Sequence, residues 1–295
     1  MKKHVLLFLF FSLSAFSQNF EKVDSIVSKY DRFSKVEDLA NQIEKDFSSD
    51  ANKSRAAFFW LTKNIRYNLR EFHSPSKRNY SFRYSSEEEK TEKLQAFKDD
   101  LVAETFKNKT GVCEEYAQSF KKICDLLAIE SEVIKGNVRN TADEIGQISN
   151  TTNHAWNVVK IDEKWIILDV TWGSGSETNG KWIRDFDDYF YDIPTHKIFK
   201  THYPEDKLWV IRFGRINEKE FYNQPIYSNT FLRLKANLIS LQTGIISLKS
   251  SESIVLKFNN LDPKPLILYT LKGSKIPQKP IIISEKNITT LTIKN

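Results

Sequence analysis

The stretch KTGVCEEYAQSFKKICDLL (109–127) contains both cysteines of the chain and predicts a helix that presents them differently. Apolar residues follow Cys113 at steps of four, three, four and three, which is helical spacing. These residues are Ala117, Phe120, Cys124 and Leu127. Cys124 lies within the stripe and is best explained as a small buried hydrophobic residue. Cys113 begins the stripe, so it is the cysteine with a candidate chemical role.

The start of the predicted helix favours a reactive thiol at Cys113. Thr110 or Gly111 is placed to cap the helix, which puts Cys113 in its first turn. Unpaired backbone N–H groups at a helix N-terminus favour a thiolate, although Glu114 and Glu115 mildly oppose one. A partly buried structural cysteine at a helix start is the alternative. A nucleophilic role therefore also requires a base, and a residue that orients the base.

His154 is the candidate base because it begins a strand-like run, HAWNVVKI (154–161). A second run, KWIILDVTW (164–172), follows after only two residues. Two such runs with a two-residue connection predict a β-hairpin in which Ile161 pairs with Lys164.

The same register places Asp169 beside His154. It puts His154 opposite Thr171, and Asp169 shares the face of Thr171 because side chains alternate along a strand. Diagonal neighbours of this kind lie ~7 to 8 Å apart by backbone, within reach of an imidazole and a carboxylate. An exposed polar pair near a strand end is the alternative, but an unpaired carboxylate inside this apolar run would be costly. The sequence therefore permits an Asp169–His154 pair.

The rest of the chain predicts helices first and strands later. Helical spacing occurs in residues 21–47, 51–68 and 87–108, and SEVIKGNV (131–138) is a further strand-like run. From about Phe231 onward short β-rich runs are separated by Gly, Pro and Asn, which predicts a small β-sandwich. We expect four parts: a signal peptide (1–17), a main domain (18–216), a linker (217–229) and a β-rich C-terminal domain (230–295).

The N-terminus, MKKHVLLFLFFSLSAFSQ (1–18), predicts secretion. Two lysines, a short apolar run and small residues including Ala15 and Ser17 are typical of a cleavable signal peptide. The apolar run is too short for a comfortable membrane span, no later run reaches the ~18 apolar residues required, and no cysteine offers a lipid-anchor site. We expect a secreted or periplasmic protein without a membrane span.

A secreted protein with two cysteines invites a disulfide, but the helix argues against one. Eleven residues along one helix separate Cys113 from Cys124 by ~16 Å. A bridge needs Cα atoms within ~7 Å. A free extracellular thiol therefore requires a functional explanation.

Four segments, in this order, resemble the transglutaminase-like superfamily, and within it the kyphoscoliosis-peptidase branch. The matching patterns are W-x-x-x-x-I-x-Y, G-V-C-x-x-Y-A, H-A-W-N and L-D-V-T-W-G-S-G. The segments are RAAFFWLTKNIRYN (55–68), KTGVCEEYAQSFKKICDLLAIESEVIKG (109–136), NHAWNVVKIDEKWIILDVTWGSG (153–175) and YFYDIPTHKIFKTHYPED (189–206). The resemblance covers roughly residues 36 to 210.

The resemblance implies an α+β, papain-like fold, in which a helix carrying the cysteine packs on an antiparallel sheet carrying the other two residues. It implies that Cys113 is the nucleophile, His154 the base and acid, and Asp169 the residue that orients His154. The expected activity is acyl transfer from a carboxamide of a protein or peptide through a thioester. Water as the acceptor gives a peptidase or deamidase, and an amine gives a transglutaminase. The peptidase branch favours hydrolysis.

Three tryptophans are further candidates at the site. Trp60 is a candidate to line the site and assist an oxyanion, although a tryptophan amid Phe58, Phe59 and Leu61 is more often core. The backbone N–H of Cys113 is the stronger oxyanion donor. Trp156 and Trp172 are candidate walls of a substrate groove, with aromatic packing on the sheet as an equal or better explanation.

We expect no cofactor, no metal and no nucleic acid. Asp185, Asp187 and Asp188 do not form a regular calcium loop, and no Cys or His set completes a tetrahedral zinc site. The glycines of TWGSG (171–175) do not follow the phosphate-loop pattern. Basic residues are not interleaved with aromatic ones in any compact motif.

The alternative to an enzyme is a non-catalytic, secreted or envelope-associated binding module on the same fold, since fold does not imply activity. Its support is the basic end of the chain: residues 222–295 hold nine lysines and one arginine against three acidic residues. Such a surface would contact an anionic cell-surface polymer, and that contact would weaken with salt. A solvated basic face is the simpler explanation.

Overall fold

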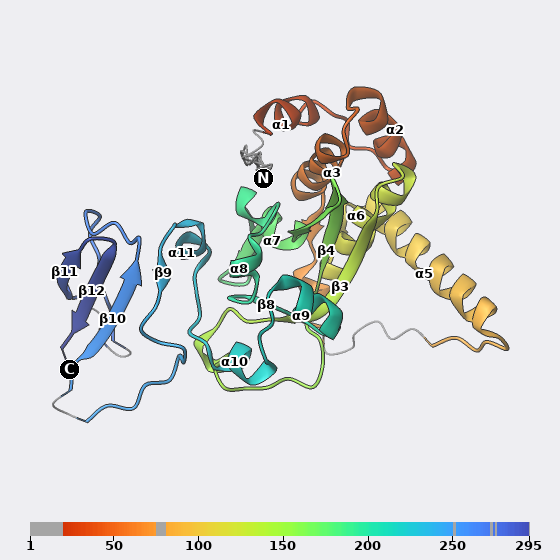
Figure 1. The fold of residues 1–295 in the computed structure, drawn as a ribbon. Helices are drawn as coiled ribbons and strands as arrows, with labels where there is room; N and C mark the ends of the chain where they lie inside the picture. The colour runs from red at the N-terminus through yellow and green to blue at the C-terminus, as the bar shows by residue number, and fades with distance from the viewer. Residues whose placement is uncertain (1–19, 75–80, 250–251, 272–273, 275, 295) are drawn as a thin grey trace, which may run out of the picture.

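The computed structural model describes residues 20–74, 81–249, 252–271, 274 and 276–294. The predicted signal peptide (1–17) lies outside them. Helices from the N-terminal part pack against a central antiparallel sheet, and a separate small sheet is formed by the C-terminal residues (Figure 1). The α+β class predicted from the sequence is confirmed. None of the helices in the described residues is long and apolar enough to cross a membrane.

The N-terminal half of the chain is mainly helical. Its helices are α1 (Glu21–Val27), α2 (Val36–Asp46), α3 (Asp50–Asn64), α4 (Leu69–Phe72), α5 (Glu87–Asn108) and α6 (Cys113–Leu126). Two short strands, β1 (Arg66–Tyr67) and β2 (Thr110–Gly111), pair in parallel, and β2 directly precedes α6. Helix α3 is buried along nearly its whole length, whereas the N-terminal half of α5 projects from the body of the molecule (Figure 1).

Helix α6 begins at Cys113, one position later than a cap at Gly111 would require and two later than a cap at Thr110 would require. Those two residues belong to β2, and Val112 is the N-cap. The Glu115 carboxylate accepts a hydrogen bond from the Val112 backbone N–H at 3.0 Å, which caps the helix in place of a serine or threonine.

The predicted apolar stripe of α6 is confirmed. Phe120 and Cys124 are fully buried in the core, and the helix packs on the central sheet and on α5. Both cysteines are free. Burial raises the pKa of the Cys124 thiol to about 12, so this cysteine is an inert packing residue.

The central sheet has the strand order β5-β4-β3-β8. The strands are β3 (Ser131–Val138), β4 (His154–Ile161), β5 (Lys164–Leu168) and β8 (His202–Pro204). The predicted hairpin register is confirmed, because Ile161 pairs with Lys164 and Asn157 pairs with Leu168. The Asn157 amide donates to the Ala117 carbonyl of α6 at 3.0 Å and fixes β4 against that helix.

The second strand of the hairpin is shorter than the sequence indicates. Strand β5 ends at Leu168, and residues Val170–Ser174 form the helical turn α7. The expectation that His154 lies opposite Thr171 is therefore wrong. Asp169 caps α7 instead, and its side chain accepts a hydrogen bond from the Trp172 backbone N–H at 3.0 Å.

Short elements make up much of the remaining structure that precedes the C-terminal sheet in the chain. They are η1 (Ala142–Glu144), β6 (Gly175–Thr178), β7 (Lys181–Arg184), η2 (Asp188–Phe190), α8 (Thr195–Ile198), α9 (Lys207–Phe213), α10 (Glu218–Asn223) and α11 (Asn229–Arg233). The expected linker at 217–229 contains α10, whose Phe221 and Tyr222 are buried. The buried Arg139 guanidinium donates to the Tyr222 carbonyl at 3.0 Å, so α10 packs on the domain that precedes it.

The β-rich C-terminal region is confirmed as a four-stranded antiparallel sheet with the order β11-β12-β10-β9. Its strands are β9 (Asn237–Leu238), β10 (Ile254–Asn259), β11 (Ile281–Glu285) and β12 (Ile288–Ile293). The described residues form one sheet here, not the two sheets of a sandwich. Several of its large apolar side chains are half exposed, including Val255 and Ile283.

Gly136 lies where β3 pairs with β8, and it has no room for a side chain. A Cβ at this position would lie 2.2 Å from the Tyr203 carbonyl oxygen and 2.6 Å from the Trp156 ring. We expect Gly136→Ala to lower the free energy of unfolding by about 1–3 kcal/mol, because a packed backbone must move. Urea unfolding measures the change. Gly180→Asn is the control, since no atom lies within 4 Å of a Cβ there and asparagine is among the residues that best tolerate the left-handed backbone at φ +71°. A wild-type stability for Gly136→Ala would contradict the crowding.

Candidate active site

Cys113 lies at a cavity that also contains His154. It is the first residue of α6 and is partly exposed. The cavity has a volume of about 300 Å³, and its lining includes Phe72, Phe97 and Asn153 as well as these two residues. The structure thus places the predicted nucleophile and the predicted base at one accessible site.

His154 and Asp169 form a direct hydrogen bond. His154 is the first residue of β4, and its ring nitrogen Nε2 lies 2.7 Å from Asp169 Oδ2. Asp169 is completely buried. The predicted pair is present, although Asp169 reaches His154 from a helix cap instead of from a strand.

The electrostatics of the pair favour a charged imidazolium and a charged carboxylate. Burial lowers the pKa of His154. The charge and hydrogen bond of Asp169 and the interaction with Cys113 outweigh burial and raise this pKa to about 10. Burial raises the pKa of Asp169, but His154 and then His202 lower it by more, so the net shift is strongly downward. Because Nε2 is engaged by Asp169, Nδ1 is the atom of His154 that remains for Cys113.

His202 is a residue that the sequence analysis missed. It is completely buried, and its Nε2 lies 3.0 Å from the same Asp169 oxygen that His154 contacts. Its Nδ1 lies 2.7 Å from Thr201 Oγ1. Burial lowers the pKa of His202 and outweighs the opposing effect of Asp169. The signal in the sequence was THYPED (201–206), which belongs to a segment of the family resemblance but has no periodicity that assigns a role to the histidine.

The three tryptophans pack against other side chains, which the sequence analysis gave as the alternative explanation for each. Trp60 is fully buried, stacks on Phe106 and donates its indole N–H to the Asp31 carbonyl, so it does not serve as an oxyanion donor. Trp156 and Trp172 do not line the Cys113 cavity. Their rings instead pack against the His154 ring, at centroid distances of 6.2 and 6.0 Å. They enclose the imidazole and keep water from the Asp169 carboxylate.

Tyr67 is an upstream side chain that interacts electrostatically with Cys113, although it does not line the Cys113 cavity. Strand pairing aligns Tyr67 with Gly111, two residues before Cys113. Its ring stacks on Trp182 and is largely buried. Burial and then the charges of Cys113 and Asp169 raise the pKa of Tyr67, so the phenol keeps its proton and remains a hydrogen-bond donor.

We expect Tyr67→Phe to slow alkylation of Cys113 by iodoacetamide by up to about tenfold, because the protonated phenol, which interacts electrostatically with Cys113, is lost. The rate is followed by intact mass in a Cys124→Ser background. Tyr203→Phe, which removes a hydroxyl from β8 away from Cys113, is the control. Equal rates for the two variants would show that the Tyr67 hydroxyl has no part in the site.

Among the described residues, His154, Asp169 and His202 are the group with ligand atoms close enough for a metal, all within 4.8 Å of one another. The two nitrogen–oxygen distances are those of hydrogen bonds, and a tetrahedral zinc would need a fourth ligand. We therefore assign a hydrogen-bonded cluster. The acidic turn considered for calcium is explained by ion pairs, since Asp187 binds Arg233 and Asp188 binds Arg55.

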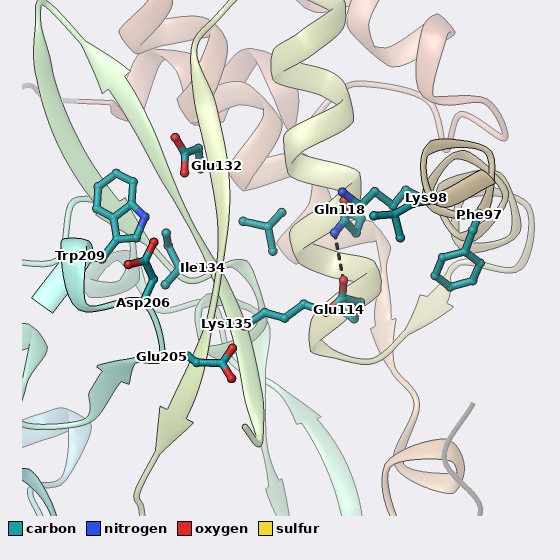
Figure 2. A pocket seen from close by; sticks show the side chains of 12 residues that line it. Phe97, Lys98, Glu114, Gln118, Glu132, Ile134, Lys135, Glu205, Asp206 and Trp209 are labelled. Atoms are coloured by element: carbon teal, nitrogen blue, oxygen red, sulfur yellow. Dashed lines mark hydrogen bonds and ion pairs between the residues drawn. The ribbon is translucent and has the colours of Figure 1, made fainter. Parts of the chain in front are cut away.

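A second cavity, of about 400 Å³, shares Phe97, Glu114 and Lys135 with the Cys113 cavity. Figure 2 shows its walls, which come from α5, α6, β3 and the start of α9. Glu114 holds this junction together: Gln118 donates to it at 2.9 Å, and Lys135 pairs with it at 3.2 Å. The two cavities adjoin at these shared residues.

A helix that begins with a cysteine, packed on an antiparallel sheet beside a histidine–aspartate pair, defines a transglutaminase-like fold. Residues 37–170 match the family model described as the transglutaminase-like superfamily, so this part of the chain is similar to that superfamily. The predicted resemblance is confirmed.

Three of the individual proteins that match share less than a quarter of the aligned residues with this chain. The chain is similar to kyphoscoliosis peptidase of Homo sapiens, with 24% identity over 223 residues, which cover 75% of this chain and 31% of the human protein. The Mus musculus protein of the same name is 24% identical over 215 residues, which cover 72% and 30%. The chain thus spans less than a third of the length of these curated relatives. A solved structure titled as that of a TGase has a TM-score of 0.31 and 18% identity, covering 59% of this chain and 37% of its own.

Proposed function

We propose that the protein is a cysteine enzyme that cleaves carboxamides of proteins or peptides through a thioester. The observation that carries the proposal is the His154–Asp169 hydrogen bond at the cavity that holds Cys113. An activated cysteine nucleophile requires an adjacent base and a group that orients the base, and these three side chains meet that requirement.

The reaction begins when the Cys113 sulfur attacks the carbonyl carbon. The C–S bond forms, and the developing oxyanion lies near the backbone N–H groups at the start of α6. The C–N bond then breaks, and the His154 imidazolium gives its proton to the departing nitrogen. In the second half, His154 takes a proton from water, the oxygen attacks the thioester, and the C–S bond breaks to release a carboxylic acid and the Cys113 thiolate.

Hydrolysis is the favoured second half-reaction because the curated relatives are named as peptidases. An amine acceptor in place of water would make the same thioester chemistry a transamidation. The protein would act in a secreted or periplasmic compartment, as residues 1–18 indicate.

The test of the proposal is the pH dependence of Cys113 alkylation by iodoacetamide in a Cys124→Ser background, with and without His154→Ala. We expect rapid labelling at about pH 6, where an ordinary free thiol that ionises near pH ~8.5 reacts slowly. Loss of His154 should remove this reactivity. Labelling that follows an ordinary thiol and ignores His154 would overturn the proposal and favour the binding module.

The pH range of amide cleavage should also follow His154. The ring must carry a proton to release the amine, and its pKa is raised to about 10. We therefore expect cleavage to decline as the pH rises through about 10, with the thiolate still able to react with iodoacetamide there. A panel of peptide amides assayed from neutral to alkaline pH checks this. A decline near the ordinary histidine pKa of ~6.5 would show that Asp169 does not hold the proton on the ring.

A further inference from the structure

Two histidines share one oxygen of Asp169. His202 begins β8, which is paired with β3 on the side opposite β4, so its ring reaches the carboxylate from a different strand than His154 does. The Nε2 atoms of His154 and His202 lie 2.7 and 3.0 Å from Asp169 Oδ2, and the Trp172 N–H donates to Oδ1 at 3.0 Å. The two oxygens of the carboxylate therefore accept three hydrogen bonds.

We propose that His202 is a positioning residue, which donates its Nε2–H to Asp169 and thereby fixes the carboxylate that orients His154. This inference rests on the proposed function. His202 does not line the Cys113 cavity, so it acts through Asp169 and not on the substrate.

The tautomer of His202 follows from its two partners. An ionised carboxylate only accepts hydrogen bonds, so Nε2 must carry the proton that points at Asp169. A neutral imidazole has one proton, so Nδ1 is an acceptor and the Thr201 hydroxyl donates to it at 2.7 Å. The other contact of that hydroxyl, with the Ile198 carbonyl at 3.5 Å, is much longer.

The surroundings keep His202 neutral. Its ring lies among Trp156 and Trp172, at centroid distances of 5.0 and 4.9 Å, and has no exposed surface. The ionisable groups that act on it are Asp169, which favours a charged ring, and His154, whose positive charge opposes one. A neutral His202 gives Asp169 a hydrogen bond without cancelling the negative charge that His154 needs.

A purely structural histidine would fill the same space, so the test must separate shape from hydrogen bonding. In the full chain with Cys124→Ser, His202→Leu keeps an apolar volume and removes the donor, whereas His202→Gln retains an N–H donor. We expect His202→Leu to slow Cys113 alkylation by iodoacetamide at about pH 6 by roughly tenfold to a hundredfold. The pH at which alkylation of this variant begins should also be higher than in the wild type. The reason is that Asp169 loses the hydrogen bond from His202, which lowers the pKa of Asp169. His202→Gln should recover most of the rate.

Controls separate this inference from the proposed function. His196→Leu, at an exposed histidine of α8, should leave the profile unchanged. A folded His202→Leu protein with the wild-type profile, or a Gln variant as slow as the Leu variant, would overturn the role of His202. If wild-type labelling already ignores His154, the proposed function fails instead.

Nitrogen-15 NMR of the histidine rings reports the tautomer and protonation state of His202 without relying on the reactivity of Cys113. We expect His202 to remain a neutral Nε2–H tautomer at neutral and mildly acidic pH, and Thr201→Val to disturb that state. A doubly protonated ring, a proton on Nδ1, or one equivalent of zinc lost on substitution of His202 would each contradict the assignment.

Discussion

Replacing Asp169 by asparagine is expected to lower the rate of amide cleavage by about 10⁴, the magnitude seen when a buried orienting carboxylate is replaced by an amide. Two ring nitrogens, of His154 and His202, point at one oxygen of Asp169. If the amide NH₂ takes that place, both rings must turn an unprotonated nitrogen toward it.

The proton of neutral His154 would then lie on Nδ1, the atom that remains for Cys113, and the ring could no longer accept the thiol proton. His202 would meet a second conflict, because a proton on its Nδ1 would face the Thr201 hydroxyl that now donates to it. If the amide oxygen takes that place, the tautomers survive but the charge that favours an imidazolium is lost. Either orientation disables the base.

The measurement is kcat/KM for a peptide amide, together with iodoacetamide labelling of Cys113 across pH. Asp192→Asn is a suitable control, since this carboxyl is also partly desolvated but contacts neither histidine. Circular dichroism and urea unfolding establish that the variants are folded. Near-normal cleavage by a folded Asp169→Asn protein would mean that the His154–Asp169 pair is structural.

Replacing Cys113 by alanine is expected to remove amide cleavage almost completely, by about 10⁶ in kcat, because the thioester cannot form. Binding of the substrate should remain, since Cys113 is only one of thirteen residues that line its cavity. The assay is hydrolysis of a peptide amide, with intact mass used to detect the acylated protein in the wild type and its absence in the variant.

Cys124→Ala is the matched control, since it removes the same group eleven residues further along the same helix. It should retain cleavage and lose stability, because Cys124 is fully buried in the core. If Cys113→Ala retained cleavage or acylation, a different nucleophile would have to be sought, or the activity would belong to a contaminant.

The parts of the site set by local geometry were predictable. Two alternating runs with a two-residue connection allow one register, and the pairing of Ile161 with Lys164 follows from it. Helical spacing likewise separated the buried Cys124 from Cys113 at the helix start. Both patterns depend on residues close together in the chain.

The end of β5 was not predictable from periodicity. Residues 165–172 are apolar enough to continue a strand, but Asp169 supplies a cap for α7, and Gly173 packs so closely on Phe58 that a Cβ would lie 2.6 Å from its ring. Tertiary packing of α7 on α3 therefore outweighs the strand propensity of Val170 and Thr171.

His202 and Tyr67 were missed because each reaches the site from a strand of only two or three residues. Such strands carry no detectable alternation, and their partners lie far away in the chain: Tyr67 aligns with Gly111, and His202 with Val138. In the C-terminal region, the apolar runs correctly predicted strands, but composition alone does not fix whether the strands form one sheet or two.

The reactive side chains and the wall of the Cys113 cavity come from different elements of the fold. The reactive groups lie on α6, β4 and the cap of α7, whereas much of the wall comes from α4, α5 and residues 152–153. Helix α5 enters the cavity through Phe97 and Leu101, whereas its first turns extend away from the body (Figure 1). Substitutions in α5 or in these loops would therefore change which sequences are accepted without moving the reacting atoms. On the proposed function, substrate identity therefore has to be sought in the wall and not in the three reactive side chains.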